Sequence, residues 1–235
     1  MKKNILLLSL FLSISFNGIS QDTATRTRTL LDMISHHYVT LKNLKDVNLK
    51  NVQGSPYESN DFQIGTIFHK ISGQKIKAFL RYNAYSDEIE VKKENTGEDV
   101  SNLIKNPNII VILNDKEYHL KQFTTIANNN SEGFLIKEPE TPVFYKLSKE
   151  YIPATKAKTS YHPASPAKFK NIKNYFLEIN DEVKEVIQHK SKVVSAFPYK
   201  HRDALKSFIK KEKLKFKKED DLVQLIAFYN TIKKG

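Results

Sequence analysis

The stretch GSPYESNDFQIGTIFHKISGQKIKAFLRYNAYSDEIEVKK, residues 54–93, alternates apolar and polar side chains between short turns. Side chains along a β-strand point to the two faces of the sheet in turn, so this alternation predicts half-buried strands. Ile76, Ala78, Leu80 and Tyr82 fall on one face of such a strand. The turns are too short for parallel crossovers, so the stretch predicts an antiparallel meander.

The same kind of pattern continues along the chain to about residue 152. The fold we expect is α+β: an antiparallel β meander, half-barrel or sandwich-like, followed by a C-terminal helical pair. Further strands are predicted at 108–113, 117–123, 133–137 and 143–148, with a hairpin at 175–186. The expected organisation is a β domain at 54–152, a Pro-rich linker at 153–170, and a basic module at 171–235 containing this hairpin and two helices.

The C-terminal segment has the periodicity of two amphipathic helices, at residues 201–213 and 219–233. Leu222, Leu225 and Ile226 follow the spacing of one helix face, and Tyr229 completes it at i+7. Acidic residues begin the second segment and lysines end it, which suits the helix dipole.

The N-terminus has the pattern of a cleaved signal peptide at residues 1–20. Lys2 and Lys3 precede twelve apolar residues, and small residues precede a cleavage point before Gln21. Twelve apolar residues are too few for a membrane span, so no transmembrane segment is expected after cleavage. The chain has no cysteine, and residues 21–53 are expected to be a polar segment with a short helix at 30–41.

The positive charge is concentrated in the last 80 residues, which hold 19 Lys and Arg against nine Asp and Glu. Such asymmetry predicts either a surface for an anionic partner or a solvated lysine-rich face that favours solubility. The lysines that we expect to face a partner are Lys210, Lys211, Lys213, Lys215, Lys217 and Lys218. No aromatic-basic nucleic-acid motif accompanies them, so no nucleic acid is expected as a partner.

The run from Leu80 to Tyr85 contains the other candidate binding residues, Arg81, Tyr82 and Tyr85. An arginine flanked by tyrosines can stack on a ligand or donate hydrogen bonds to it. The structural alternative is that Tyr82 closes a sheet face while Arg81 pairs with Asp87 or Glu88 across the turn.

One pattern combines Gly54–Tyr57, Leu80–Asn83 and Asp87-Glu88 with Phe208–Lys211, Glu219–Leu222 and Tyr229-Asn230 near the C-terminus. Together these segments resemble a set of uncharacterised exported proteins of Bacteroidota-type bacteria. The resemblance spans roughly residues 50–232 and implies an exported location and an architecture. It implies no activity, and it supplies no catalytic residues.

Two other functions remain open from the sequence. Glu88 and Glu90 lie two residues apart on one strand face and could form the carboxylate pair of a hydrolase, although the same alternation is typical of a solvent-facing strand. A curved sheet could also carry an apolar ligand, lined by Phe68, Leu80 and Tyr82.

The sequence contains none of the common short catalytic, phosphate-binding or metal-binding motifs. No nucleophile elbow, phosphate-binding loop or metal-binding histidine motif occurs, so no catalytic residue, metal site or cofactor is predicted.

The function that these patterns favour is an exported, soluble, non-enzymatic binding protein. Its basic C-terminal part would face an anionic envelope component or an acidic protein. Its location would be the periplasm, the outer-membrane surface or the extracellular medium.

Overall fold

The computed structural model describes residues 34–38, 51–92, 100–138, 142–157 and 163–233. The predicted signal peptide and most of the polar segment that follows lie outside these residues. Within them, no helix is long and apolar enough to cross a membrane.

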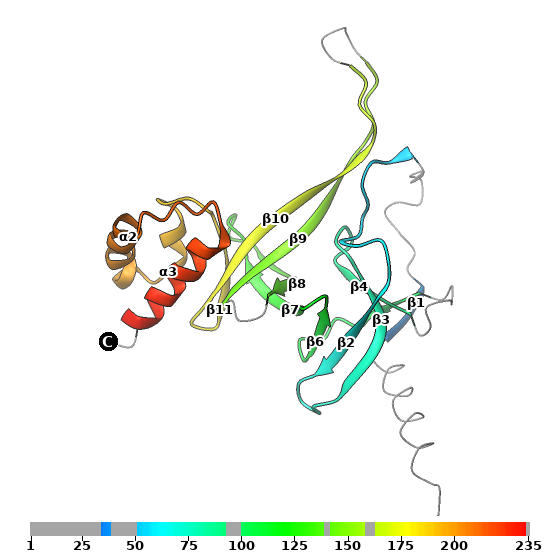
Figure 1. Ribbon diagram of the computed structural model, residues 1–235, viewed down its shortest axis with the longest axis horizontal. Helices are drawn as coiled ribbons and strands as arrows, with labels where there is room; N and C mark the ends of the chain where they lie inside the picture. Colours follow the sequence, from blue (N-terminus) through cyan, green and yellow to red (C-terminus); the bar gives the residue numbers. More distant parts are fainter. Residues whose placement is uncertain (1–33, 39–50, 93–99, 139–141, 158–162, 234–235) are drawn as a thin grey trace, which may run out of the picture.

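The fold is α+β, as predicted, with strands in one twisted sheet and a small helical module at the C-terminal end (Figure 1). The strands are β1 Ile34–Tyr38, β2 Gln63–His69, β3 Lys75–Asn83, β4 Glu88–Lys92, β5 Ser101–Leu103, β6 Ile109–Leu113, β7 Lys116–Thr124, β8 Asn130–Lys137, β9 Val143–Ile152, β10 Lys168–Ile179 and β11 Glu182–Val186. The helical elements are the 3₁₀ helices η2 Val193–Ala196 and η3 Tyr199–His201 and the α-helices α2 Arg202–Lys211 and α3 Glu219–Ile232.

The first half of the sheet, β1 to β6, is an antiparallel arrangement in the order β1-β5-β4-β3-β2-β6. The alternation predicted for β3 is confirmed, because Ile76, Ala78, Leu80 and Tyr82 are all buried. They pack in a cluster that also receives Tyr118 from β7. This cluster joins the first half of the sheet to the second.

The last five strands, β7 to β11, close on themselves. β8 pairs with both β7 and β9, β10 pairs with β9 and β11, and β11 returns to β7 through one parallel residue pair, Lys184 with Thr124. A separate apolar cluster contains one side chain from each of these strands: Phe123, Leu135, Phe144, Phe176 and Val183. We call this closed set of strands the five-strand ring.

His119 of β7 lies edge-on to Phe144 of this ring, with ring centroids 5.6 Å apart. Burial lowers the pKa of His119 below its usual 6.5, although the neighbouring Glu117 carboxylate, 2.8 Å away, opposes the shift. The unfolded chain therefore binds this proton more readily, and stability is expected to fall as the pH drops below about 6.5 through the folded-state pKa.

The test compares urea unfolding of the wild type and His119→Gln at about pH 7.5 and about pH 5. We expect the variant to lose less stability on acidification than the wild type, since its side chain cannot take up a proton. Equal losses in the two proteins would show that His119 does not contribute to the pH dependence.

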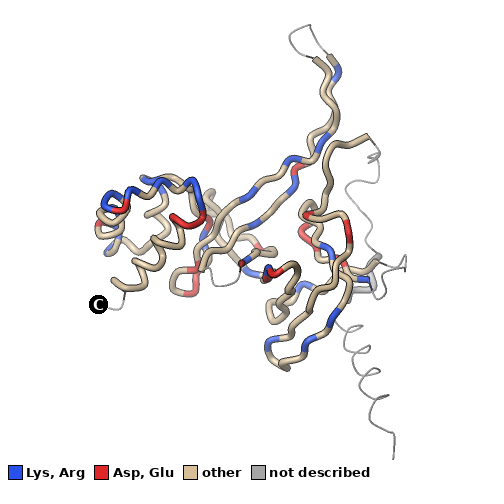
Figure 2. The backbone as a smooth tube through the Cα atoms, viewed as in Figure 1, with Lys and Arg blue, Asp and Glu red and all other residues tan. Residues whose placement is uncertain are grey.

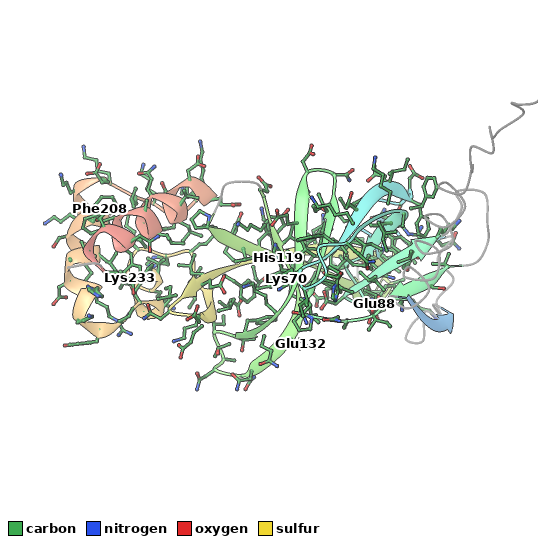
Figure 3. The ribbon with its side chains drawn as sticks, turned by 90° about the horizontal axis from the view of Figure 1, so that it is seen from below. Lys70, Glu88, His119, Glu132, Phe208 and Lys233 are labelled. Atoms are coloured by element: carbon green, nitrogen blue, oxygen red, sulfur yellow. The ribbon has the colours of Figure 1, made fainter. Side chains whose placement is uncertain are left out.

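The predicted helical pair is present and packs against the ring. Leu205 and Ile209 of α2 lie in one cluster with Leu222 and Leu225 of α3, and Val143 of β9 and Leu177 of β10 belong to the same cluster. Asp221 and the other acidic residues occupy the first turn of α3, as expected. Figure 3 places Phe208 of this module and Glu88 of the first half toward opposite ends of the molecule.

The helix expected within residues 30–41 is not what the structure shows. Ile34–Tyr38 forms β1, which pairs with β5. The segment contains β-branched and aromatic residues that suit a strand, and pairing at the sheet edge overrides its weak helical periodicity.

The Pro-rich segment expected to link two domains joins the two antiparallel strands of one hairpin instead. The pairing of β9 with β10 runs from Val143 opposite Leu177 to Ile152 opposite Lys168. Beyond these strands, Thr155 bridges to Ser165. The hairpin projects from the sheet as a long arm (Figure 1). A boundary between residues 152 and 171 would therefore divide one continuous hairpin.

Candidate functional site

Arg81 is held on several sides by neighbouring residues. Its Nε and Nη2 atoms donate to Glu90 Oε2 at 3.0 and 2.5 Å, and Nη1 donates to the Asn60 carbonyl at 2.8 Å. The guanidinium carbon lies 3.6 Å from the ring centroid of Tyr57 and 4.2 Å from that of Phe62. The contacts with Tyr57, Asn60 and Phe62 fasten the segment before β2 onto the sheet, and the contact with Glu90 joins β3 to β4.

The prediction that Arg81 pairs with Asp87 or Glu88 is wrong. Its partner is Glu90, which lies directly opposite on β4. Glu90 was also expected to face solvent, but it is fully buried, and Asn83 Nδ2 donates to its other oxygen at 3.2 Å. The segment around Asn60 covers this face of β4, which strand alternation alone cannot reveal.

The carboxylate pair proposed for a hydrolase does not form a free pair. Both oxygens of Glu90 accept hydrogen bonds from Arg81 and Asn83. Glu88 is partly exposed and lies 3.1 Å from Lys105 Nζ; burial raises its pKa, and Lys105 opposes that rise. A general acid and base must both reach a substrate, and Glu90 is enclosed.

Tyr82 belongs to a buried polar cluster on the other face of β3. Its hydroxyl donates to Asp87 Oδ1 at 2.7 Å, and Lys146 Nζ lies 2.8 Å from the same oxygen. Burial raises the pKa of Tyr82 well above its usual value, and the Asp87 charge adds to the shift, so the hydroxyl remains a donor. A Cβ atom at Gly133 would overlap Asp87 Oδ2 and Lys146 Nζ, so a larger residue there would displace the ends of these two side chains.

Arg81 and Tyr82 both line a pocket of about 250 Å³, together with Glu58, Lys116 and Tyr118. Glu58 accepts hydrogen bonds from the Tyr118 hydroxyl and, at 2.8 Å, from Lys116 Nζ. The polar groups thus satisfy one another, and the volume is below the roughly 300–1,000 Å³ of most ligand sites. The pocket has the character of a structural polar network.

The other residues predicted to line a site do not join this pocket. Tyr85 packs edge-on against Phe169 of the arm, with ring centroids 5.6 Å apart. Phe68 pairs with Lys75 and therefore lies on the sheet face opposite Leu80 and Tyr82, so the three side chains proposed for a carrier do not line one cavity.

Unlike the candidate residues described above, the six lysines that were predicted to face a partner are all exposed. They lie at the end of α2 and in the connection to α3, and we call residues 210–218 the basic loop. Within it, Leu214 and Phe216 are 3% and 2% exposed and belong to the helical core, whereas Lys213 and Lys215 alternate with them on the outside. The alternation anchors the loop and directs its lysines outward.

The backbone of the basic loop is held in a costly conformation. Lys213 and Phe216 have φ values of 56° and 58°, which cost non-glycine residues about 1–2 kcal/mol each. The Asp221 carboxylate accepts hydrogen bonds from the backbone N–H groups of Lys215 at 3.0 Å and Phe216 at 2.6 Å. Strain of this kind persists where surrounding contacts enforce it, and it is frequent at functional sites.

Few acidic groups neutralise this loop. Among the six lysines, Lys211 is the one with a carboxylate in ion-pair range within the described residues, with its Nζ 3.7 Å from Glu212. Figure 2 shows the resulting run of blue along α2 and the following connection. The loop thus presents exposed positive charge, and its two apolar side chains are buried.

A groove that the sequence did not predict lies between the β7–β8 connection and the β10–β11 turn. Its volume is about 690 Å³, and Asn128 and Glu132 face Asp181 and Glu182 across it. These segments are about 50 residues apart and meet because the five-strand ring closes, so no local pattern indicates the groove. It contains none of the predicted site residues.

No protein-family model, curated protein or solved structure matches the chain. The fold and surface define an α+β protein in which a curved sheet, a five-strand ring and a basic helical module follow one another along the long axis (Figure 1). Its function is inferred from the residues and geometry of this chain.

Proposed function

We propose that this is an exported, non-enzymatic binding protein whose basic loop binds an anionic envelope component or an acidic protein. The observation that carries the proposal is the alternation of buried Leu214 and Phe216 with exposed lysines. A solvated lysine face on an ordinary helix needs neither buried anchors nor a strained backbone. A loop fixed in this way presents its charges with little loss of backbone entropy on binding.

Export is supported by the signal-peptide pattern of residues 1–20. The lack of a free carboxylate pair at Glu88 and Glu90 favours binding over hydrolysis. Because the apolar side chains of the basic loop point into the core, the loop offers charge alone, so binding through it should be strongly sensitive to salt.

The test reverses three charges together, Lys213→Glu, Lys215→Glu and Lys217→Glu. Co-sedimentation with isolated cell-envelope fractions at low salt is expected to fall at least about tenfold, since each lysine near an anionic surface contributes about 1 kcal/mol. The wild type should lose the same binding at high salt.

A matched control reverses three exposed lysines of the arm, Lys156, Lys168 and Lys170, which changes the net charge equally. This control should retain most of the binding. Equal losses in the two triple variants would show that net charge decides and would refute a role for the basic loop. Wild-type binding that persists at high salt and in the loop variant would refute it as well.

A further inference from the structure

A second surface, on one face of β2, β3 and β6, is apolar and is not covered by any described element. Ile64 pairs with Phe79, and Phe68 pairs with Ile110, so these four side chains share one face. Ile112, opposite Thr66, belongs to the same face. Ile64 is 65% exposed, and the other four side chains are partly buried. We call these five residues the apolar sheet face.

The β2–β3 turn extends this surface with a further exposed isoleucine. Ile71 is 76% exposed, and a Cβ atom at Gly73 would meet nothing within 4 Å, which places the turn in open solvent. The turn is nevertheless ordered, because Gly73 N–H donates to the His69 carbonyl at 2.9 Å and Ser72 contacts the His69 ring. An apolar side chain is therefore held at the tip of a projecting hairpin (Figure 1).

Lysines surround this surface without acidic partners. Lys70, Lys75 and Lys77 are exposed, and none of the three has a carboxylate in ion-pair range among the described residues. Lys75 Nζ lies 5.4 Å from the Phe68 ring centroid, so its charge sits beside the apolar side chains. Figure 2 shows blue without adjoining red along this hairpin, at the lower edge of the view.

Two of the carboxylates on the same face are paired with cations, Glu90 with Arg81 and Glu88 with Lys105. Glu117 contacts His119 instead, whose pKa is lowered by burial, so Glu117 keeps its charge near neutral pH. Lys70, Lys75 and Lys77 thus form a positive rim beside exposed isoleucines, without ion-pair partners in the part of the chain that the structure describes.

We propose that the apolar sheet face and the β2–β3 turn dock on an anionic lipid bilayer. Ile71 and Ile64 would enter the boundary between headgroups and acyl chains, and Lys70, Lys75 and Lys77 would contact the anionic headgroups. Affinity for a bilayer surface scales with buried apolar area plus attraction to anionic lipids, and this surface supplies both. Lysine stems can lie along the apolar region while their charges stay in the headgroup layer.

A second copy of the chain fits this surface less well. A two-fold interface places the same patch of both copies in contact, which would bring two sets of unpaired lysines together. The proposal is also independent of the basic loop, which offers charge without exposed apolar side chains. Salt therefore separates the two surfaces, because insertion of isoleucine persists when charge attraction is screened.

The experiment measures flotation of the purified chain with vesicles of phosphatidylcholine alone and with added phosphatidylglycerol. We expect binding to the anionic vesicles, with a fraction that persists at high salt. Ile64→Ser with Ile71→Ser should weaken binding at least about tenfold at both salt concentrations. Lys75→Gln with Lys77→Gln should weaken it about 30-fold at low salt and much less at high salt.

Matched controls test the position of the changes. Ile126→Ser removes an isoleucine that is 59% exposed on another loop, and Lys168→Gln with Lys170→Gln removes two exposed lysines of the arm. Neither control should change binding by more than about twofold.

Insertion itself can be followed because the chain has no tryptophan. Ile71→Trp creates a single reporter whose emission should shift to the blue with anionic vesicles and be quenched by brominated lipids. Ile126→Trp should show neither change.

The proposal is wrong if the wild type does not float with anionic vesicles, or if Ile71→Trp shows no shift. It is also wrong if only the triple change in the basic loop abolishes flotation, an outcome that leaves the proposed function intact. A dimer in sedimentation equilibrium that Ile64→Ser and Ile71→Ser dissociate, without vesicle binding, would assign the face to contact between copies. Flotation through the hairpin with no effect of the basic loop on envelope binding would support this proposal and refute the other.

Discussion

Replacing Arg81 with leucine is expected to lower the free energy of unfolding by about 3–5 kcal/mol. The substitution would leave Glu90 with a fully buried carboxylate and no cationic partner. It would also remove the stacking of the guanidinium against Tyr57 and Phe62 and the hydrogen bond to the Asn60 carbonyl. The contacts with Tyr57, Asn60 and Phe62 join the segment before β2 to the sheet, so we expect proteolysis to begin there.

The measurement is urea denaturation of Arg81→Leu, Glu90→Leu and the double variant. The double variant should be more stable than the sum of the single losses predicts, because it leaves no unpaired charge. Arg81→Lys should recover only part of the loss, since an ammonium group cannot reproduce the forked contact with Glu90.

Lys77→Leu on the same strand provides a control, because this lysine is exposed and has no ion-pair partner among the described residues, and the change should alter stability by less than about 0.5 kcal/mol. If Arg81→Leu also lowered the free energy of unfolding by only about 0.5 kcal/mol, the buried pair would contribute no more than a surface ion pair.

Alternation and helical periodicity predicted the parts of the fold that depend on local pattern. The inward residues of β3, Ile76 to Tyr82, and the apolar face of α3 both lie where their spacing places them. These predictions work because a strand or an amphipathic helix must bury one face, whatever element covers it.

The features that sequence reasoning missed depend on contacts between distant segments. Glu90 has the spacing of a solvent-facing residue, but Asn60 and its neighbours, 30 residues upstream, cover it. Likewise, the five-strand ring closes through Lys184 and Thr124, whose pairing no local signal indicates. For the site, the exposure of the lysines was predictable, whereas the left-handed backbone at Lys213 and Phe216 was not.

Phe216→Ala is expected to lower the free energy of unfolding by about 3–5 kcal/mol, the usual cost of removing a buried phenylalanine. Phe216 is 2% exposed and packs in the helical core with Leu222 and Ile226. The variant should also lose salt-sensitive envelope binding at temperatures where it remains folded, because the basic loop loses its anchor. Urea unfolding followed by circular dichroism and co-sedimentation measure the two effects.

Phe197 provides a matched control, since it is 1% exposed in the same cluster but has an ordinary φ of −94° and lies outside the basic loop. Phe197→Ala should cost similar stability and leave envelope binding unchanged in the folded protein.

Replacing each phenylalanine with glycine as well as alanine separates the cost of backbone strain from the cost of lost packing. At φ 58° glycine avoids a cost of about 1–2 kcal/mol that alanine retains, so Phe216→Gly should be the more stable of the two Phe216 variants. At Phe197 the order should reverse, because glycine there adds only backbone entropy to the unfolded chain. If the alanine variant were more stable than the glycine variant at both positions, the basic loop would not be strained. That result would remove the argument that the conformation of the loop is maintained for binding.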